Sequence, residues 1–123
     1  MEKILCWSTC ILLCLFAWIN SGFACSGSCY APPFIFGAVC QGNTGIFGYP
    51  GSKQYYSVSV NGNAGTLVCC HGRGYNARQR EEWYSIGCGH ENFGLSVPWG
   101  NVLSMPAIKC KGAPFGATLS FTC

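Results

Sequence analysis

Alternating apolar and polar residues form the clearest pattern in this sequence. Residues 55–60 (YYSVSV) place an apolar side chain at every second position, and residues 66–70 (TLVCC) follow after the short connection 61–65 (NGNAG). Alternation with a period of two is typical of a half-buried β-strand, and Asn-Gly between two such segments is typical of a hairpin turn. The pattern therefore predicts a β-hairpin over residues 55–70.

The register of this hairpin is predicted from the two faces of its strands, because a shift by one residue moves every side chain to the other face. In the register that separates apolar from polar side chains, Val58 lies opposite Leu67 and Tyr56 opposite Cys69. Cys69 then points into the core and Cys70 to the opposite side. The two adjacent cysteines are therefore expected to reach different partners.

The rest of the chain predicts short strands and turns. Three further segments carry a strand pattern: 34–36, 82–86 and 117–123. The last ends at Cys123, whose disulfide would hold the terminal strand to the sheet. Glycine and proline recur every few residues, which argues against long helices. Residues 76–82 (NARQREE) are expected to form one or two helical turns, with Asn76 as N-cap and Gln79 at position N3.

The first 24 residues have the layout of a secretory signal peptide. A charged start precedes an apolar run at 4–19, which is shorter than the roughly 20 residues of a membrane-spanning helix. Small residues at Gly22 and Ala24 suit a signal peptidase. We predict cleavage after Ala24, leaving a secreted, extracellular domain over 25–123 with no transmembrane segment. A retained membrane anchor is the alternative.

The number of cysteines indicates how the folded chain is cross-linked. Of the eleven cysteines, Cys6, Cys10 and Cys14 fall in the signal peptide. The remaining eight are Cys25, Cys29, Cys40, Cys69, Cys70, Cys88, Cys110 and Cys123. An even number in an oxidising compartment predicts four disulfides, whose pairing the sequence does not choose. Together with the strand pattern, the cysteine count predicts a small, disulfide-rich all-β fold.

The segment 68–74 (VCCHGRG) raises the question of a metal or thiol site. A zinc site would draw on Cys69, Cys70, His71, Cys88 and His90. Their spacing is not that of zinc ligands, and both zinc binding and thiol catalysis need cysteines that secretion oxidises. We therefore expect no metal and no cofactor.

A small secreted hydrolase, similar to a ribonuclease, is a further alternative. General acid–base catalysis could use five residues: His71, His90, Glu81, Glu82 and Glu91. Their order along the chain does not match that of small secreted ribonucleases, and the two adjacent glutamates beside arginines are more simply a solvated charge cluster. We therefore predict that the protein is not an enzyme.

Net charge and aromatic content indicate a binding surface. The net charge is +3, which favours anionic partners but lacks the dense Lys/Arg footprint of a nucleic-acid-binding protein. Seven aromatic residues exceed the needs of a small core: Phe34, Phe36, Phe47, Tyr49, Trp83, Trp99 and Phe115. Some are expected at the surface, where aromatic rings contact sugars or membrane interfaces.

The candidate binding residues lie in two basic segments. Arg73, Tyr75, Arg78 and Arg80 occupy a glycine-containing stretch suited to phosphate, sulfate or carboxylate groups. Two further cations, Lys109 and Lys111, flank Cys110 and extend the patch if a disulfide brings them close.

Two short motifs carry a resemblance: Tyr56-x-x-x-Val60-x-Gly62 with Leu67 on the return strand, and 110–116 (CKGAPFG) with a strand closing at Cys123. They resemble the macadamia-type antimicrobial proteins, a plant family with a βγ-crystallin-like fold. This chain departs from that family by a Val at position 60, by more cysteines and by an extra segment at about 71–97. The resemblance implies a compact Greek-key β-domain, a sandwich or barrel, that acts against microbes without enzymatic chemistry.

We therefore expect a secreted, non-enzymatic defence protein that binds the anionic or glycan surface of a target cell. A secreted effector or toxin directed at a host or competitor is the main alternative.

Overall fold

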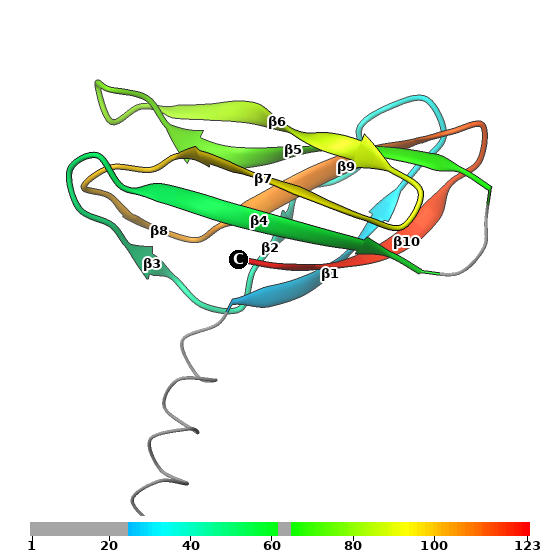
Figure 1. The fold of residues 1–123 in the computed structure, drawn as a ribbon, viewed down its shortest axis with the longest axis horizontal. Coiled ribbons are helices and arrows are strands. Elements are labelled where there is room, and N and C mark those ends of the chain that lie inside the picture. Colours follow the sequence, from blue (N-terminus) through cyan, green and yellow to red (C-terminus); the bar gives the residue numbers. More distant parts are fainter. Residues whose placement is uncertain (1–24, 62–64) are drawn as a thin grey trace, which may run out of the picture.

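The chain is an all-β protein built from two four-stranded antiparallel sheets (Figure 1). The computed structural model describes residues 25–61 and 65–123. Sheet A contains, in spatial order, β1 (Ser26–Ala31), β10 (Ala117–Thr122), β4 (Lys53–Val60) and β7 (Asn92–Pro98). Sheet B contains β2 (Cys40–Gln41), β9 (Ala107–Ala113), β5 (Leu67–Tyr75) and β6 (Glu81–Gly89). A two-stranded ribbon joins β3 (Ile46–Phe47) to β8 (Leu103–Ser104).

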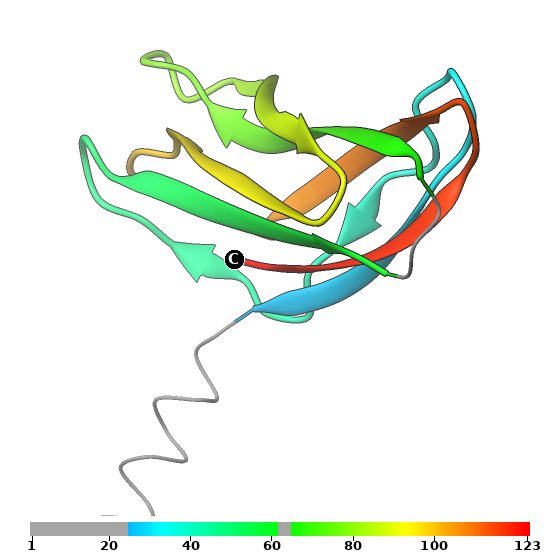
Figure 2. The ribbon, with the colours of Figure 1, turned by 45° about the vertical axis from the view of Figure 1, so that its right-hand side comes forward.

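The two sheets stack as a sandwich and do not close into a barrel (Figure 2). Inward side chains alternate with outward ones, as in β10, where Ala117, Leu119 and Phe121 are buried and their neighbours exposed. Apart from the ribbon strands β3 and β8, every strand except β5 is followed along the chain by a strand of the opposite sheet, and such crossing connections are typical of Greek-key sandwiches. The predicted signal peptide lies outside the described residues, and the described part contains no helix able to cross a membrane.

Tyr56 joins the two sheets at the centre of the core. Its side chain is fully buried, and its hydroxyl donates a hydrogen bond to the Arg73 carbonyl of β5 at 2.7 Å. The same oxygen accepts a hydrogen bond from the N–H of Ala107 at 3.3 Å, so the buried hydroxyl has a partner both as a donor and as an acceptor. Burial raises the pKa of Tyr56 far above its usual value. A Cβ at Gly72 would lie 2.8 Å from the Tyr56 ring, so this ring requires glycine on the facing strand.

The predicted hairpin over residues 55–70 is wrong. β4 pairs with β10 and β7, whereas β5 pairs with β6 and β9, so these two strands belong to opposite sheets. The inner face of β5 is also the opposite of the predicted one, because Val68 and Cys70 are buried while Leu67 is exposed. Both faces of TLVCC are apolar, so alternation alone does not decide which face points into the core. The prediction that Cys69 and Cys70 reach different partners is confirmed.

Of the other local predictions, two strands are confirmed and two segments are wrong. The strands expected at 82–86 and 117–123 are confirmed as parts of β6 and β10. Residues 34–36 are a loop and not a strand. Residues 76–80 form a tight turn between β5 and β6 and not a helix, while Asn76 accepts the N–H groups of Arg78 and Arg80 through its side chain. The hairpin pairing of β5 with β6 outweighs the weak helical preference of so short a segment.

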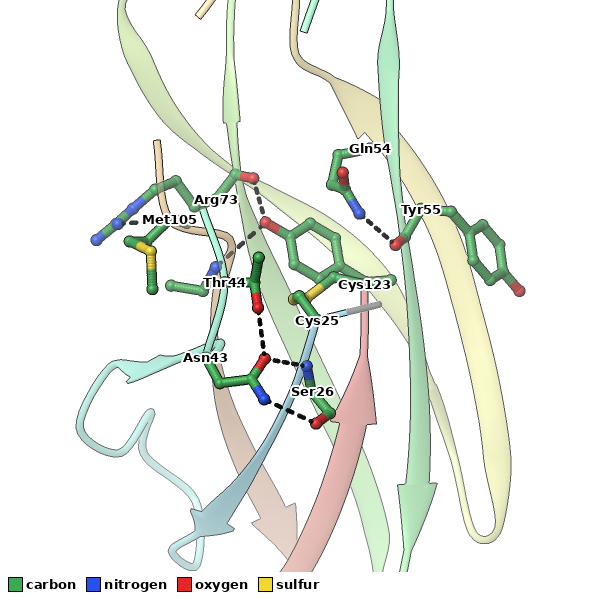
Figure 3. Close-up of a disulfide and its surroundings, with 11 residues drawn as sticks. Cys25, Ser26, Asn43, Thr44, Gln54, Tyr55, Arg73, Met105 and Cys123 are labelled. Atoms are coloured by element: carbon green, nitrogen blue, oxygen red, sulfur yellow. Dashed lines mark hydrogen bonds between the residues drawn. A yellow bond between two sulfur atoms is a disulfide. The ribbon is translucent and has the colours of Figure 1, made fainter. Parts of the chain in front are cut away.

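Four disulfides cross-link the sandwich, as predicted. Cys69–Cys88 and Cys70–Cys110 each join directly paired residues of neighbouring strands in sheet B. Cys29–Cys40 connects β1 of sheet A to β2 of sheet B. Cys25–Cys123 links the residue before β1 to the residue after β10, beside two hydrogen bonds between Ser26 and Asn43 (Figure 3). The terminal strand is thereby held to the sheet, as expected for a closing cysteine.

Candidate functional site

The outer face of sheet B carries three of the six lysine and arginine side chains that the structure describes. On β5, Val68, Cys70 and Gly72 point into the core, so the intervening residues His71 and Arg73 point outward. His71 pairs with Lys109 of β9, Cys69 pairs with Lys111, and Arg73 pairs with Trp83 of β6. We call this surface the basic face and define it by the following residues: Phe36, His71, Arg73, Trp83, Lys109 and Lys111.

Two aromatic rings support the ammonium groups of the basic face. The Lys109 Nζ lies 4.7 Å from the centroid of the Trp83 ring and 5.6 Å from that of Phe36. The Lys111 Nζ lies 4.9 Å from the Phe36 centroid. Phe36 also packs against the His71 ring, with 4.5 Å between the two centroids. Cation–π contacts of this kind hold the lysine heads in place while leaving them half-exposed to a ligand.

Arg73 is held more firmly than either lysine. Its side chain is only 14% exposed, and its Nη1 donates to the Met105 carbonyl at 3.1 Å (Figure 3). Its Nε lies 3.6 Å from the Glu81 Oε1, and its Cζ lies 5.6 Å from the Trp83 centroid. Arg73 therefore acts as a fixed charge at the edge of the basic face, with one carboxylate beside it.

The basic face carries more cationic side chains than carboxylates, and this excess of positive charge sets its electrostatics. Within residues 25–61 and 65–123, Arg73–Glu81 is the one ion pair, so Lys109 and Lys111 have no carboxylate partner in that part of the chain. Burial lowers the pKa of His71, and the two lysines lower it further. The unliganded face thus disfavours a further proton, and a bound anion would favour one.

The predicted binding residues fall into two groups. Arg73, Lys109 and Lys111 share the basic face, because β9 lies beside β5 and the Cys70–Cys110 disulfide joins the two strands. The other three predicted residues lie at the end of β5 and in the turn after it. The Tyr75 hydroxyl donates to Ser104 Oγ at 2.6 Å, and its ring meets Trp99 edge-on at 5.1 Å. Arg78 and Arg80 are exposed and line a shallow hollow with both glutamates of β6.

A groove of about 570 Å³ lies at this same end of the sandwich. Three loops form it, and its wall is largely aromatic and proline side chains with amides at the margin: Pro50, Tyr75, Asn76, Gln79, Tyr84, Pro98, Trp99 and Asn101 are among the lining residues. Trp99 itself is buried, in contrast to the surface aromatics Phe34, Phe47, Tyr49 and Phe115. The groove and the basic face are separate candidate binding surfaces.

The histidines and carboxylates weighed for catalysis do not come together. His90 lies in the β6–β7 turn, where its Nδ1–H donates to the Thr66 carbonyl at 3.0 Å. His71 lies five residues further along β5 than Thr66, which corresponds to roughly 15 Å of strand. Glu82 accepts hydrogen bonds from Asn76 and Tyr84, in that order of influence, and these lower the pKa of its carboxyl.

The three cysteines considered as metal ligands or nucleophiles are all in disulfides, Cys69 with Cys88 and Cys70 with Cys110. Among the residues that the structure describes, no three His, Cys, Asp or Glu side chains are grouped as a metal site would need.

Phe36 and Trp83 belong to the basic face but were predicted only as members of a group of aromatics of which some lie at the surface, and His71 was considered only as a catalytic or metal-binding residue. The signal that could have placed His71 and Trp83 is the pairing of β5 with β9 and β6, which sets residue 71 beside residue 109 and residue 83 beside residue 73. Local sequence carries no such information.

Fold and surface together define a class: a disulfide-cross-linked β-sandwich with a cationic, aromatic sheet face. Comparisons of the chain with protein-family models, with curated proteins and with solved structures gave no match. The resemblance to macadamia-type antimicrobial proteins therefore stays a prediction.

Proposed function

We propose that this chain is a secreted, non-enzymatic binding protein that attaches to anionic groups on a target cell through its basic face. Its role, in this proposal, is defence against microbes. The observation that carries the proposal is the grouping of Arg73, Lys109 and Lys111 on one sheet face, with two aromatic rings supporting the charges.

Rigidity of the face supports this function. The Cys69–Cys88 and Cys70–Cys110 disulfides join β6, β5 and β9, the three strands that contribute to the basic face. A cross-linked sheet loses little conformational freedom when it binds, which strengthens binding without additional contacts. Lys109 and Lys111 lie two residues apart on one strand, so their Cα atoms are separated by roughly 7 Å, a spacing suited to repeated phosphate or sulfate groups.

Heparin, a soluble sulfated polysaccharide, tests the proposal directly. We expect Lys109→Gln/Lys111→Gln to weaken heparin binding by the oxidised protein roughly 30-fold, because two contacts of about 1 kcal/mol each are lost. The measurement is isothermal titration at low salt.

The matched control is Arg78→Gln/Arg80→Gln, which removes the same net charge from the exposed turn beyond the sheet. We expect this control to weaken binding less than about threefold, since it changes only the long-range field. Equal losses in the two variants would show that net charge, and not the basic face, determines binding. Unchanged binding in the lysine variant would contradict the proposal.

A further inference from the structure

The loop between β1 and β2 is fixed against β9 at the border of the basic face (Figure 2). Phe34 N–H donates to the Gly112 carbonyl at 2.8 Å, and Gly37 N–H donates to the Cys110 carbonyl at 2.9 Å. Gly112 N–H in turn donates to the Pro32 carbonyl at 2.8 Å. Three backbone hydrogen bonds thus hold this six-residue segment to a strand that is itself disulfide-bonded.

Phe34 has a backbone conformation that its side chain does not favour. Its φ is +65°, in the left-handed region that residues other than glycine, Asn and Asp rarely occupy. Strain of this kind persists where surrounding contacts enforce it and often accompanies a function. Here the enforced backbone presents Phe34 and Ile35 to solvent, where they are 68% and 67% exposed.

Two more exposed apolar side chains flank the same part of β9. Phe115 follows β9 and is 62% exposed, and its backbone is held by hydrogen bonds to and from the Thr66 hydroxyl, each 3.0 Å. Leu67 begins β5 and is paired with Ala113 of β9. We call this group the apolar rim and define it by Phe34, Ile35, Leu67 and Phe115.

The apolar rim adjoins the basic face. Phe34 and Leu67 line a small hollow of about 150 Å³ together with Lys111. Phe36, two residues after Phe34, lies under the ammonium groups of Lys109 and Lys111. Exposed apolar side chains therefore form one continuous surface with two lysines that have no carboxylate partner in the described part of the chain.

We infer that the anionic partner of the basic face is a lipid bilayer whose headgroups carry negative charge. The inference rests on the proposed function and names its target. The apolar rim enters the interfacial region of the bilayer, while Lys109 and Lys111 bind headgroup phosphates.

The apolar rim favours a bilayer over a soluble polyanion. A polysaccharide offers anions to the lysines but nothing that removes Phe34 and Ile35 from water, whereas the interfacial layer does both. Phe36 beneath the two ammonium groups suits the same depth, because an aromatic ring with polar neighbours is favoured at a membrane interface.

The test compares vesicles of phosphatidylcholine mixed with phosphatidylglycerol, vesicles of phosphatidylcholine alone, and heparin. We expect the oxidised protein to bind the mixed vesicles and not the neutral ones. Phe34→Ser/Ile35→Ser should weaken binding to the mixed vesicles about tenfold or more while changing heparin affinity less than about twofold. Retained heparin binding also shows that this variant is folded.

The matched control is Phe47→Ser/Leu103→Ser, a cross-strand pair that is 72% and 68% exposed on the β3–β8 ribbon, at the other end of the sandwich from the β1–β2 loop (Figure 1). We expect it to bind the mixed vesicles as the unchanged protein does. If the protein binds heparin but not the mixed vesicles, or if the rim variant binds them normally, the inference is wrong and the proposed function stands. If neither heparin nor the mixed vesicles are bound, the proposed function fails with it.

Discussion

His71 is the residue of the basic face whose charge changes near physiological pH. The lysines on β9 and the Phe36 ring surround it, with Ser85 opposite on β6. Burial first, and then Lys109 and Lys111, lower its pKa below 6.5. Folding therefore weakens proton binding, so the contribution of neutral His71 to stability is complete above pH 6.5 and is lost as the pH falls toward the lowered pKa.

A bound anion favours the protonated form of His71, so binding of an anion should depend on pH. Because a nearby negative charge favours the imidazolium, binding to heparin takes up a proton. We expect affinity at constant ionic strength to rise several-fold between neutral pH and about pH 5. His71→Gln should remove most of that rise and His90→Gln should not, since His90 contacts Thr66, five residues from His71 along the chain, and is not part of the basic face. A rise that survives in His71→Gln would place the titrating group elsewhere.

At the scale of elements, β5 shows why one part of the structure followed from sequence and another did not. The strands containing residues 82–86 and 117–123 were predictable, because alternation and turn residues mark them locally. The pairing of β5 was not. Its segment TLVCC is apolar on both faces, and the choice between them depends on Gly72 and Gly74, which leave room for the Tyr56 and Tyr84 rings. That space is a property of the assembled sandwich.

The same strand carries two disulfides with different surroundings, and their removal should have unequal effects. Cys70–Cys110 is fully buried and spans 40 residues, while Cys69–Cys88 lies on the outer face and spans 19. Loop-closure entropy assigns about 4 kcal/mol to the first and about 3 kcal/mol to the second. Removal of Cys70–Cys110 also loses core packing, which adds to its destabilising effect.

We therefore expect Cys70→Ala/Cys110→Ala to lower the free energy of unfolding by at least about 1 kcal/mol more than Cys69→Ala/Cys88→Ala. Denaturant titration of the oxidised variants measures the difference. The reverse order would show that the outer disulfide, and not the core pair, holds β5 in place.

At the scale of the whole molecule, composition and cysteine count were enough to predict a four-disulfide, all-β fold. The grouping of predicted site residues was only partly accessible. Lys109 and Lys111 join Arg73 because β9 lies beside β5, a contact between segments more than 30 residues apart in sequence. Arg78 and Arg80, although close to Arg73 along the chain, lie in the turn beyond the sheet. Closeness in sequence was therefore a poor guide to closeness on the surface.

The central claim is that one sheet face, and not the charge of the molecule as a whole, binds the anionic partner. Amide chemical shifts recorded while a short heparin fragment is added to the oxidised, isotopically labelled protein test it residue by residue. We predict that the largest changes occur at Phe36, His71, Lys109 and Lys111, with smaller ones across sheet A. Changes centred on residues 76–80 and the end groove, with the basic face unaffected, would contradict the account.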